Sequence, residues 1–186
     1  GELVQKGGLE ALIQDVAMLH AMGMRIVLVH GSRPQVQEQL DLRKVTSRYG
    51  TGAMSGYRIT APAALECAKE ASGELRLDME AAFSQGLPNT PMAGSRISVI
   101  SGNFITARPV GVVDGVDFMH TGLVRKVDSE SIQHSLANNK IVLMSPLGFS
   151  PTGQAFNIAY EDVATATAMA IKADKLIFLT EYNGIT

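Results

Sequence analysis

The chain has 186 residues, of which 46% are hydrophobic and 18% charged, a composition that is typical of a folded globular domain and excludes a disordered one. Its net charge of −2 and its lack of tryptophan give no support to binding of nucleic acid or of an anionic membrane surface. The single cysteine, Cys67, excludes an internal disulfide framework and favours a reducing, cytoplasmic location, and no apolar run approaches the roughly 20 residues of a membrane span.

The first 40 residues follow the rhythm of a parallel α/β sheet. Apolar residues at helical spacing predict an amphipathic helix over residues 8–22, with Gly23 as its C-cap. A strand over Arg25–Val29 follows, and a glycine turn leads into a second helix over Pro34–Leu40. The turn after such a strand is where open α/β sheets bind ligands, although a tight turn without a ligand is the alternative.

The character of the sequence changes after this second helix. Residues 41–57 are basic and glycine-rich with little periodicity, so we predict a mobile surface segment whose role stays open. Thr60-Ala61-Pro62 then begins a helix, with a hydroxyl near the N-cap and proline in the first turn. The helical pattern continues to about Gln85.

From Ser95 the period becomes strand-like. We predict one strand over residues 97–100 and another within Phe104–Val113. Asp114-Gly115 is a strong signal for a two-residue hairpin. Asp128 is expected to cap a helix that runs through Leu136 and ends at Asn138-Asn139.

The last third of the chain returns to the α/β alternation. Ile141–Met144 reads as a buried strand, and a glycine-containing loop over 148–154 follows. An alanine-rich helix over Glu161–Ala173 and a final strand over Lys175–Thr180 complete the pattern. Since no repeat or linker interrupts it, we expect one domain over residues 1–186, cut at both ends.

Three loops that follow strands are expected to converge at one edge of the sheet: His30–Pro34, Ser101–Asn103 and Ser145–Asn157. Arg58 can project into the same region, where its planar fork would suit a carboxylate, with a solvated surface arginine as the alternative. Asn157 can hydrogen-bond a ligand amide or carbonyl, or satisfy its own backbone instead.

Other reactive side chains lack a catalytic pattern. Glu161 and Asp162 lie in the first turn of a helix, where the macrodipole stabilises them without any catalytic role. The four histidines lack the spacing of metal ligands, and Cys67 reads as a buried structural thiol. No catalytic triad order, Walker A or dinucleotide-binding motif is present, so the residues alone predict a small-molecule-binding α/β domain.

Taken together and in order, several stretches resemble the amino-acid kinase fold and, more narrowly, the amino-terminal domain of the N-acetylglutamate synthase family. Within that fold, Gly-Ser-Arg-Pro-Gln after the strand, Ser-Gly-Asn-Phe-Ile and Phe-Asn-x-x-x-Glu-Asp are specific to the synthases. The stretches that carry the resemblance are Val27–Val36, Gly56–Thr60, Ser101–Phe104, Gly111–Asp117 and Phe156–Lys175.

The resemblance implies a three-layer αβα sandwich of the carbamate kinase-like type, with a mainly parallel central sheet. It also implies a regulatory domain that cooperates with a separate carboxy-terminal acetyltransferase (GNAT) domain, expected beyond these residues together with all catalytic residues. That partner domain would transfer acetyl from acetyl-CoA to L-glutamate in the first step of arginine biosynthesis. L-Arginine would act as feedback inhibitor, in a homo-oligomer, and no cofactor or metal is expected in residues 1–186.

By the same resemblance, Gly31, Arg58 and Asn157 match the positions that hold the acylglutamate in N-acetylglutamate kinase, Arg58 at a carboxylate and Asn157 at the amino-acid end. Ser32 and Arg33 replace two glycines of the kinase loop and are expected to intrude on that space. Glu161 replaces the aspartate that organises the catalytic lysines. These departures predict a vestigial, kinase-inactive site. An active N-acetylglutamate kinase and a module that serves only oligomerisation are the alternatives.

Overall fold

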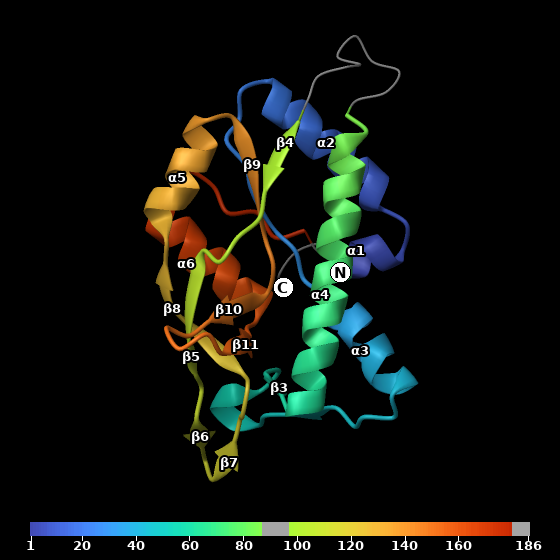
Figure 1. Cartoon of the computed structure of the whole chain (residues 1–186), viewed down its shortest axis with the longest axis vertical. Coiled ribbons are helices and arrows are strands. Elements are labelled where there is room, and N and C mark those ends of the chain that lie inside the picture. Colours follow the sequence, from blue (N-terminus) through green and yellow to red (C-terminus); the bar gives the residue numbers. More distant parts are fainter. Residues whose placement is uncertain (87–96, 180–186) are drawn as a thin grey trace.

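A three-stranded parallel sheet forms the centre of the molecule (Figure 1). In the computed structural model, which describes residues 1–86 and 97–179, its order is β1 (Val27–Val29), β9 (Lys140–Met144) and β4 (Ser98–Ile100). Strand β9 therefore has a hydrogen-bonded neighbour on each side. The predicted strand over Ile141–Met144 is confirmed as buried, with four of its residues inaccessible to solvent.

Alternate side chains of β9 point into two different cores. Ile141 packs with α2 (Leu9–Ala21) and α4 (Pro62–Ser84), whereas Val142 and Met144 pack with α5 (Ser129–Ala137) and α6 (Tyr160–Ile171). Because successive residues of a strand face opposite sides of the sheet, one short apolar run packs against a helical layer on each side. Figure 1 shows α2 and α4 on one side of the sheet and α5 and α6 on the other. The predicted three-layer αβα sandwich is confirmed.

A second, mixed sheet continues from the carboxyl end of β9. Its order is β11 (Ala155–Asn157), β10 (Leu147–Phe149), β5 (Ile105–Pro109) and β8 (Gly122–Val127). The predicted loop over residues 148–154 is therefore partly wrong, because β10 and β11 form an antiparallel hairpin. Close packing explains the glycine at position 148 of this strand, because a Cβ there would lie 2.7 Å from Cδ1 of Ile158.

The basic segment over residues 41–57 also carries more structure than predicted. Its β2 (Arg48–Tyr49) pairs antiparallel with β3 (Arg58–Ile59), and a 3-10 turn over Gly52–Met54 lies between them. A Cβ on Gly50 would lie 2.7 Å from the ring of Phe118, so this segment packs closely on the buried phenylalanine. The remaining elements are α1 (Glu2–Gln5), α3 (Arg33–Leu42), β6 (Val112–Val113) and β7 (Val116–Asp117).

Several local predictions are confirmed with their expected geometry. The C-cap of α2 is Met22 and not Gly23, which follows it with a φ of +92°. Asp114 and Gly115 have φ values of +51° and +76° in the turn between β6 and β7. The Asp128 carboxylate accepts a hydrogen bond from the backbone N–H of Ser131 at 3.1 Å and caps α5. The long helix α4 ends at Ser84, one residue before the predicted position.

The predicted final strand is wrong. Residues 175–179 belong to no strand in the described part of the chain, and Thr180, the predicted end of that strand, lies outside it. An apolar run adopts a strand only where a neighbouring strand accepts its hydrogen bonds, and Leu176–Leu179 are exposed instead. Thr60 directly precedes Ala61, the N-cap of α4, and Pro62 is in its first turn, as predicted; the Thr60 hydroxyl is buried and donates to the carbonyl of Arg58.

Two further sequence predictions concern membrane-spanning helices and the thiol of Cys67. No helix within residues 1–86 and 97–179 has the length and apolar character needed to cross a bilayer. Cys67 is fully buried, and its sulfur accepts a hydrogen bond from Nη1 of Arg43 at 3.1 Å, which agrees with a structural thiol.

The layer contact between α4 and β9 gives a stability prediction. Phe83 is 1% exposed and packs against Ile13, Val16 and Ile141, so Phe83→Ala should lower the free energy of unfolding by about 3–5 kcal/mol through lost burial and a residual cavity. Leu77→Ala, on the same helix but 57% exposed, should change it by less than about 0.5 kcal/mol. Urea unfolding of both variants measures this difference, and equal losses would contradict the assigned layer packing.

Candidate functional site

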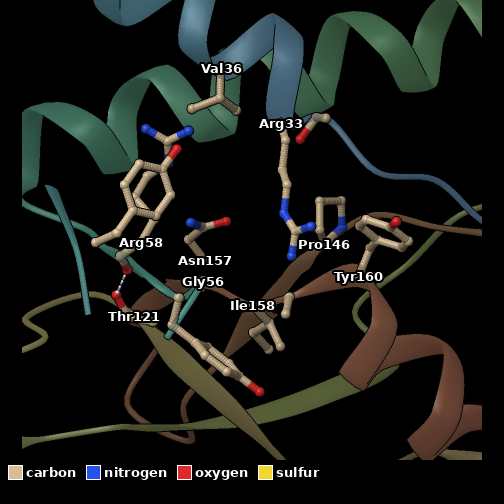
Figure 2. A pocket seen from close by; sticks show the side chains of 13 residues that line it. Arg33, Val36, Gly56, Arg58, Thr121, Pro146, Asn157, Ile158 and Tyr160 are labelled. Atoms are coloured by element: carbon tan, nitrogen blue, oxygen red, sulfur yellow. Dashed lines mark hydrogen bonds between the residues drawn. The ribbon is translucent and has the colours of Figure 1, made fainter. Parts of the chain in front are cut away.

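A pocket opens where the two sheets meet, next to the N-termini of α3 and α6. A water-sized sphere can occupy about 40 Å³ inside it, within about 510 Å³ of space that includes open solvent. Residues from β3 and β11 and from the starts of α3 and α6 line it, and Figure 2 shows Asn157 between Arg58 and Arg33. The loops after β1 and β9 reach this pocket, as predicted. The predicted loop over Ser101–Asn103 does not line the pocket. The Ser101 hydroxyl donates instead to Glu80 on α4.

Arg58 is a buried cation in this pocket. The residue is 8% exposed, and Nη1 donates to Oε1 of Gln37 at 3.2 Å and to the hydroxyl of Ser47. Its guanidinium lies 4.9 Å from the centre of the Tyr49 ring, and burial lowers the pKa of Arg58. No carboxylate of the described residues pairs with it. The alternative of a solvated surface arginine is therefore wrong, and the site offers positive charge to an anion.

Asn157 lies at the end of β11, and its side chain joins a buried hydroxyl network. Nδ2 donates to Oγ1 of Thr60 at 3.1 Å, and the Thr60 backbone N–H donates to Oγ1 of Thr121 at 3.0 Å. The Thr121 hydroxyl in turn bonds the carbonyl of Arg58. The side chain does not satisfy its own backbone, which was the alternative. The network holds the amide and the arginine in fixed relative positions.

Arg33, which lines the pocket, forms a two-pronged ion pair with Glu161, which does not; both side chains are partly exposed to solvent. Nη2 of Arg33 donates to Oε2 of Glu161 at 3.0 Å, and Nη1 lies 2.9 Å from Oε1. The Arg33 guanidinium is 5.1 Å from the centre of the Tyr160 ring. A Cβ on Gly31 would lie 2.8 Å from Cδ1 of the same tyrosine, so this glycine allows the ring to approach the backbone.

Ser32 is turned away from this ion pair. Its buried hydroxyl lies 2.9 Å from that of Ser72 on α4, and it makes no cap hydrogen bond to α3. Of the two side chains expected to replace glycines, Arg33 is the one that extends into the pocket, as Figure 2 shows.

Three tyrosines that line the pocket, Tyr49, Tyr57 and Tyr160, were not predicted as site residues. The Tyr57 hydroxyl donates to Oδ2 of Asp162 at 2.8 Å. Burial raises the pKa of both Tyr57 and Tyr160, so both phenols stay protonated at neutral pH. Thr60 and Thr121 were also missed: a threonine in a strand gives no signal of function, and only the pairing of distant segments brings these hydroxyls to Asn157.

His30 lies beside the pocket but does not line it. Its ring is 3% exposed, and Nε2 is 2.8 Å from the hydroxyl of Ser145, which links the ends of β1 and β9. Burial lowers the pKa of His30 to about 4, so the ring is neutral at pH 7. No group of three or more metal-ligating side chains occurs in the described ranges, 1–86 and 97–179.

Known proteins resemble this chain along its whole length. The family model described as the amino acid kinase family matches residues 1–186. A curated amino-acid acetyltransferase from Ralstonia nicotianae is 73% identical over 185 residues, which cover 100% of this chain and 40% of that relative. The chain thus spans about 40% of the length of the curated relatives it matches.

Two crystal structures of N-acetylglutamate synthase from Neisseria gonorrhoeae are also similar. One, complexed with coenzyme A and L-arginine, is 34% identical with a TM-score of 0.88, over 97% of this chain and 41% of that one. The other, complexed with coenzyme A and N-acetyl-glutamate, is 35% identical with a TM-score of 0.86, over 100% and 41%.

The buried histidine gives a pH prediction. Since the pKa of His30 is about 4 in the folded protein and near 6.5 when unfolded, the unfolded chain takes up a proton first as the pH falls. The stabilisation is fully present above pH 6.5 and is lost progressively down to about pH 4. Between pH 7 and pH 5, the loss in unfolding free energy should be about 2 kcal/mol larger for the wild type than for His30→Gln. Urea unfolding at both pH values tests this, and identical losses would refute it.

Proposed function

The chain belongs to the amino acid kinase family, and we propose that it is the regulatory, kinase-inactive domain of an N-acetylglutamate synthase. The catalytic acetyltransferase (GNAT) domain of the whole protein would lie outside residues 1–186. That domain would transfer acetyl from acetyl-CoA to the amine of L-glutamate, in the first step of arginine biosynthesis. The observation that carries the proposal is the similarity to amino-acid acetyltransferases along the entire chain.

The charges in the pocket support the loss of kinase activity. Phosphoryl transfer depends on positioning and on cations that stabilise the developing charge. Arg33 stands where the kinases have a glycine, and its guanidinium is already neutralised by Glu161. The carboxylate of Glu161 is equally engaged and is not free to organise other groups. An ATP-dependent N-acetylglutamate kinase is therefore the less favoured alternative.

The remaining pocket residues support a vestigial acylglutamate site. Arg58 is a buried cation without a carboxylate within ion-pair distance in the described part of the chain, and Asn157 lines the same pocket with its amide nitrogen bonded to Thr60. In this proposal Arg58 would hold a carboxylate and Asn157 the amino-acid end, next to Gly31, while Ser32 and Arg33 narrow the space. The gonococcal structures hold their ligands in a longer protein, so they leave the occupancy of this pocket open.

L-Arginine is proposed as the effector of the whole protein. A relative that is 34% identical was crystallised with coenzyme A and L-arginine together, which supports both an acetyl-CoA-dependent reaction and an arginine-responsive assembly. Inhibition requires that arginine bind two conformations of the protein with unequal affinity. We further propose a cytoplasmic homo-oligomer. A module that serves only oligomerisation is the second alternative.

Activity of the full-length protein tests this proposal. We expect acetyl transfer from acetyl-CoA to L-glutamate, suppressed about fivefold or more by saturating L-arginine, and no ADP formation from ATP and N-acetyl-L-glutamate. A coupled assay for free coenzyme A and one for ADP measure the two reactions on the same preparation.

Each alternative predicts a different pattern in these assays. Phosphorylation without acetyl transfer would establish the kinase and overturn the interpretation of Arg33 and Glu161. An acetyl-transfer rate that does not change on addition of L-arginine would favour a domain that serves only oligomerisation.

A further inference from the structure

The charge that lines the pocket is positive. Among the described residues, 1–86 and 97–179, two arginines line it, Arg33 and Arg58, and no aspartate or glutamate does. Arg33 pairs with Glu161, which lies outside the lining. No carboxylate in this part of the chain comes within ion-pair distance of Arg58. One guanidinium of the pocket therefore has no counter-charge at close range.

Neutral groups hold the Arg58 guanidinium in place. It contacts the side-chain oxygens of Gln37 and Ser47 and the ring of Tyr49. Asp41 acts on it only at longer range, because the Gln37 amide lies between them and donates to the Asp41 carboxylate at 2.8 Å. Since Arg58 is 8% exposed, water solvates its charge poorly, and an anion in the pocket would offset that cost.

Two helices begin at this pocket without a side-chain cap. The N-cap of α3 is Ser32, whose hydroxyl bonds a serine of α4 and not the helix, and the N-cap of α6 is Ala159, which has no polar side chain. Both N-cap residues line the pocket, whereas Glu161 and Asp162 in the first turn of α6 do not. The free backbone N–H groups of a helix start attract an anion, so they favour the same kind of ligand as the buried arginine.

The space in the pocket limits the size of that anion. A water-sized sphere can occupy about 40 Å³, and one buried water needs roughly 10–15 Å³ on the same measure, so there is room for about three waters. A halide ion or formate matches this size. An acyl amino acid, with two carboxylates and an amide, is several times larger.

We propose that the pocket binds a small monovalent anion, of the size of formate or a halide, at Arg58, and that it excludes an intact acyl amino acid. The anion site is argued from charge and volume alone. Its description as a former acylglutamate site rests on the proposed function, in which the domain has lost its kinase activity and keeps only the counter-ion of the buried arginine.

Thermal unfolding of the full-length protein tests the anion site. A ligand that binds only the folded state raises Tm. Sodium formate at about ten times its Kd should raise the Tm of the wild type by about 3 °C, and Arg58→Gln should lose this rise. Arg125→Gln is the matched control, because it removes the same charge from an exposed position of β8, away from the pocket, and should keep the rise.

Two further measurements locate the anion and test its size. Anomalous diffraction from wild-type crystals soaked in sodium bromide should show a bromide peak in contact with the Arg58 guanidinium, and this result needs no variant to fold. N-Acetyl-L-glutamate should change the Tm of the wild type and of Arg58→Gln by the same amount, since binding elsewhere in the protein is common to both.

Three results would overturn the proposal. A formate-dependent rise of equal size in the wild type and Arg58→Gln, or a bromide-soaked crystal with no peak in the pocket, would exclude an anion at Arg58. A rise with N-acetyl-L-glutamate that Arg58→Gln abolishes would show that the pocket admits an acyl amino acid. Neither acetyl transfer nor ADP formation is measured here, so failure of the anion site and failure of the proposed function are told apart.

Discussion

The burial of β9 on both of its faces is the constraint on which the rest of the structure depends. Its apolar side chains alternate between the core with α2 and α4 and the core with α5 and α6, while β1 and β4 pair with its two edges. A strand enclosed in this way fixes the position of its carboxyl end. The chain leaves that end at Ser145, which His30 holds, and continues through Pro146 into the wall of the pocket.

The pocket itself is held by polar contacts between distant segments. Thr60, Thr121 and Asn157 come from β-segments separated by 61 and 97 positions, yet their side chains form one buried network. Buried hydroxyls and amides are costly unless they are paired, so the network also aligns the strands that carry it. The backbone carbonyl of Arg58 accepts from the same network, whereas its guanidinium is positioned by Gln37, Ser47 and the ring of Tyr49.

The two arginines of the pocket differ in the groups that contact their guanidinium. The Arg58 guanidinium contacts neutral oxygens and an aromatic ring, whereas the Arg33 guanidinium pairs with a carboxylate. In the proposed vestigial site, Arg33 does not have to stay free for phosphoryl transfer, and it pairs with the partly exposed Glu161 outside the pocket lining. A regulatory role for the domain, as proposed, needs a stable scaffold that couples to other parts of the protein more than it needs an open active site.

The sequence alone determined the features that depend on neighbours along the chain. The periodicity over residues 8–22, the turn at Asp114-Gly115 and the cap at Asp128 are decided by side-chain spacing and local backbone dihedrals. Four of the residues that line the pocket, Ser32, Arg33, Arg58 and Asn157, were also named, because their types and order resemble a known family, whereas the predicted Gly31 and Glu161 do not line it. Only the tertiary structure decided the pairing of β10 with β11 and β5, the contact of Ser32 with Ser72, and the ion pair of Arg33 with Glu161. These depend on hydrogen bonds and ion pairs between residues far apart in sequence, and no local preference specifies which distant group will lie opposite.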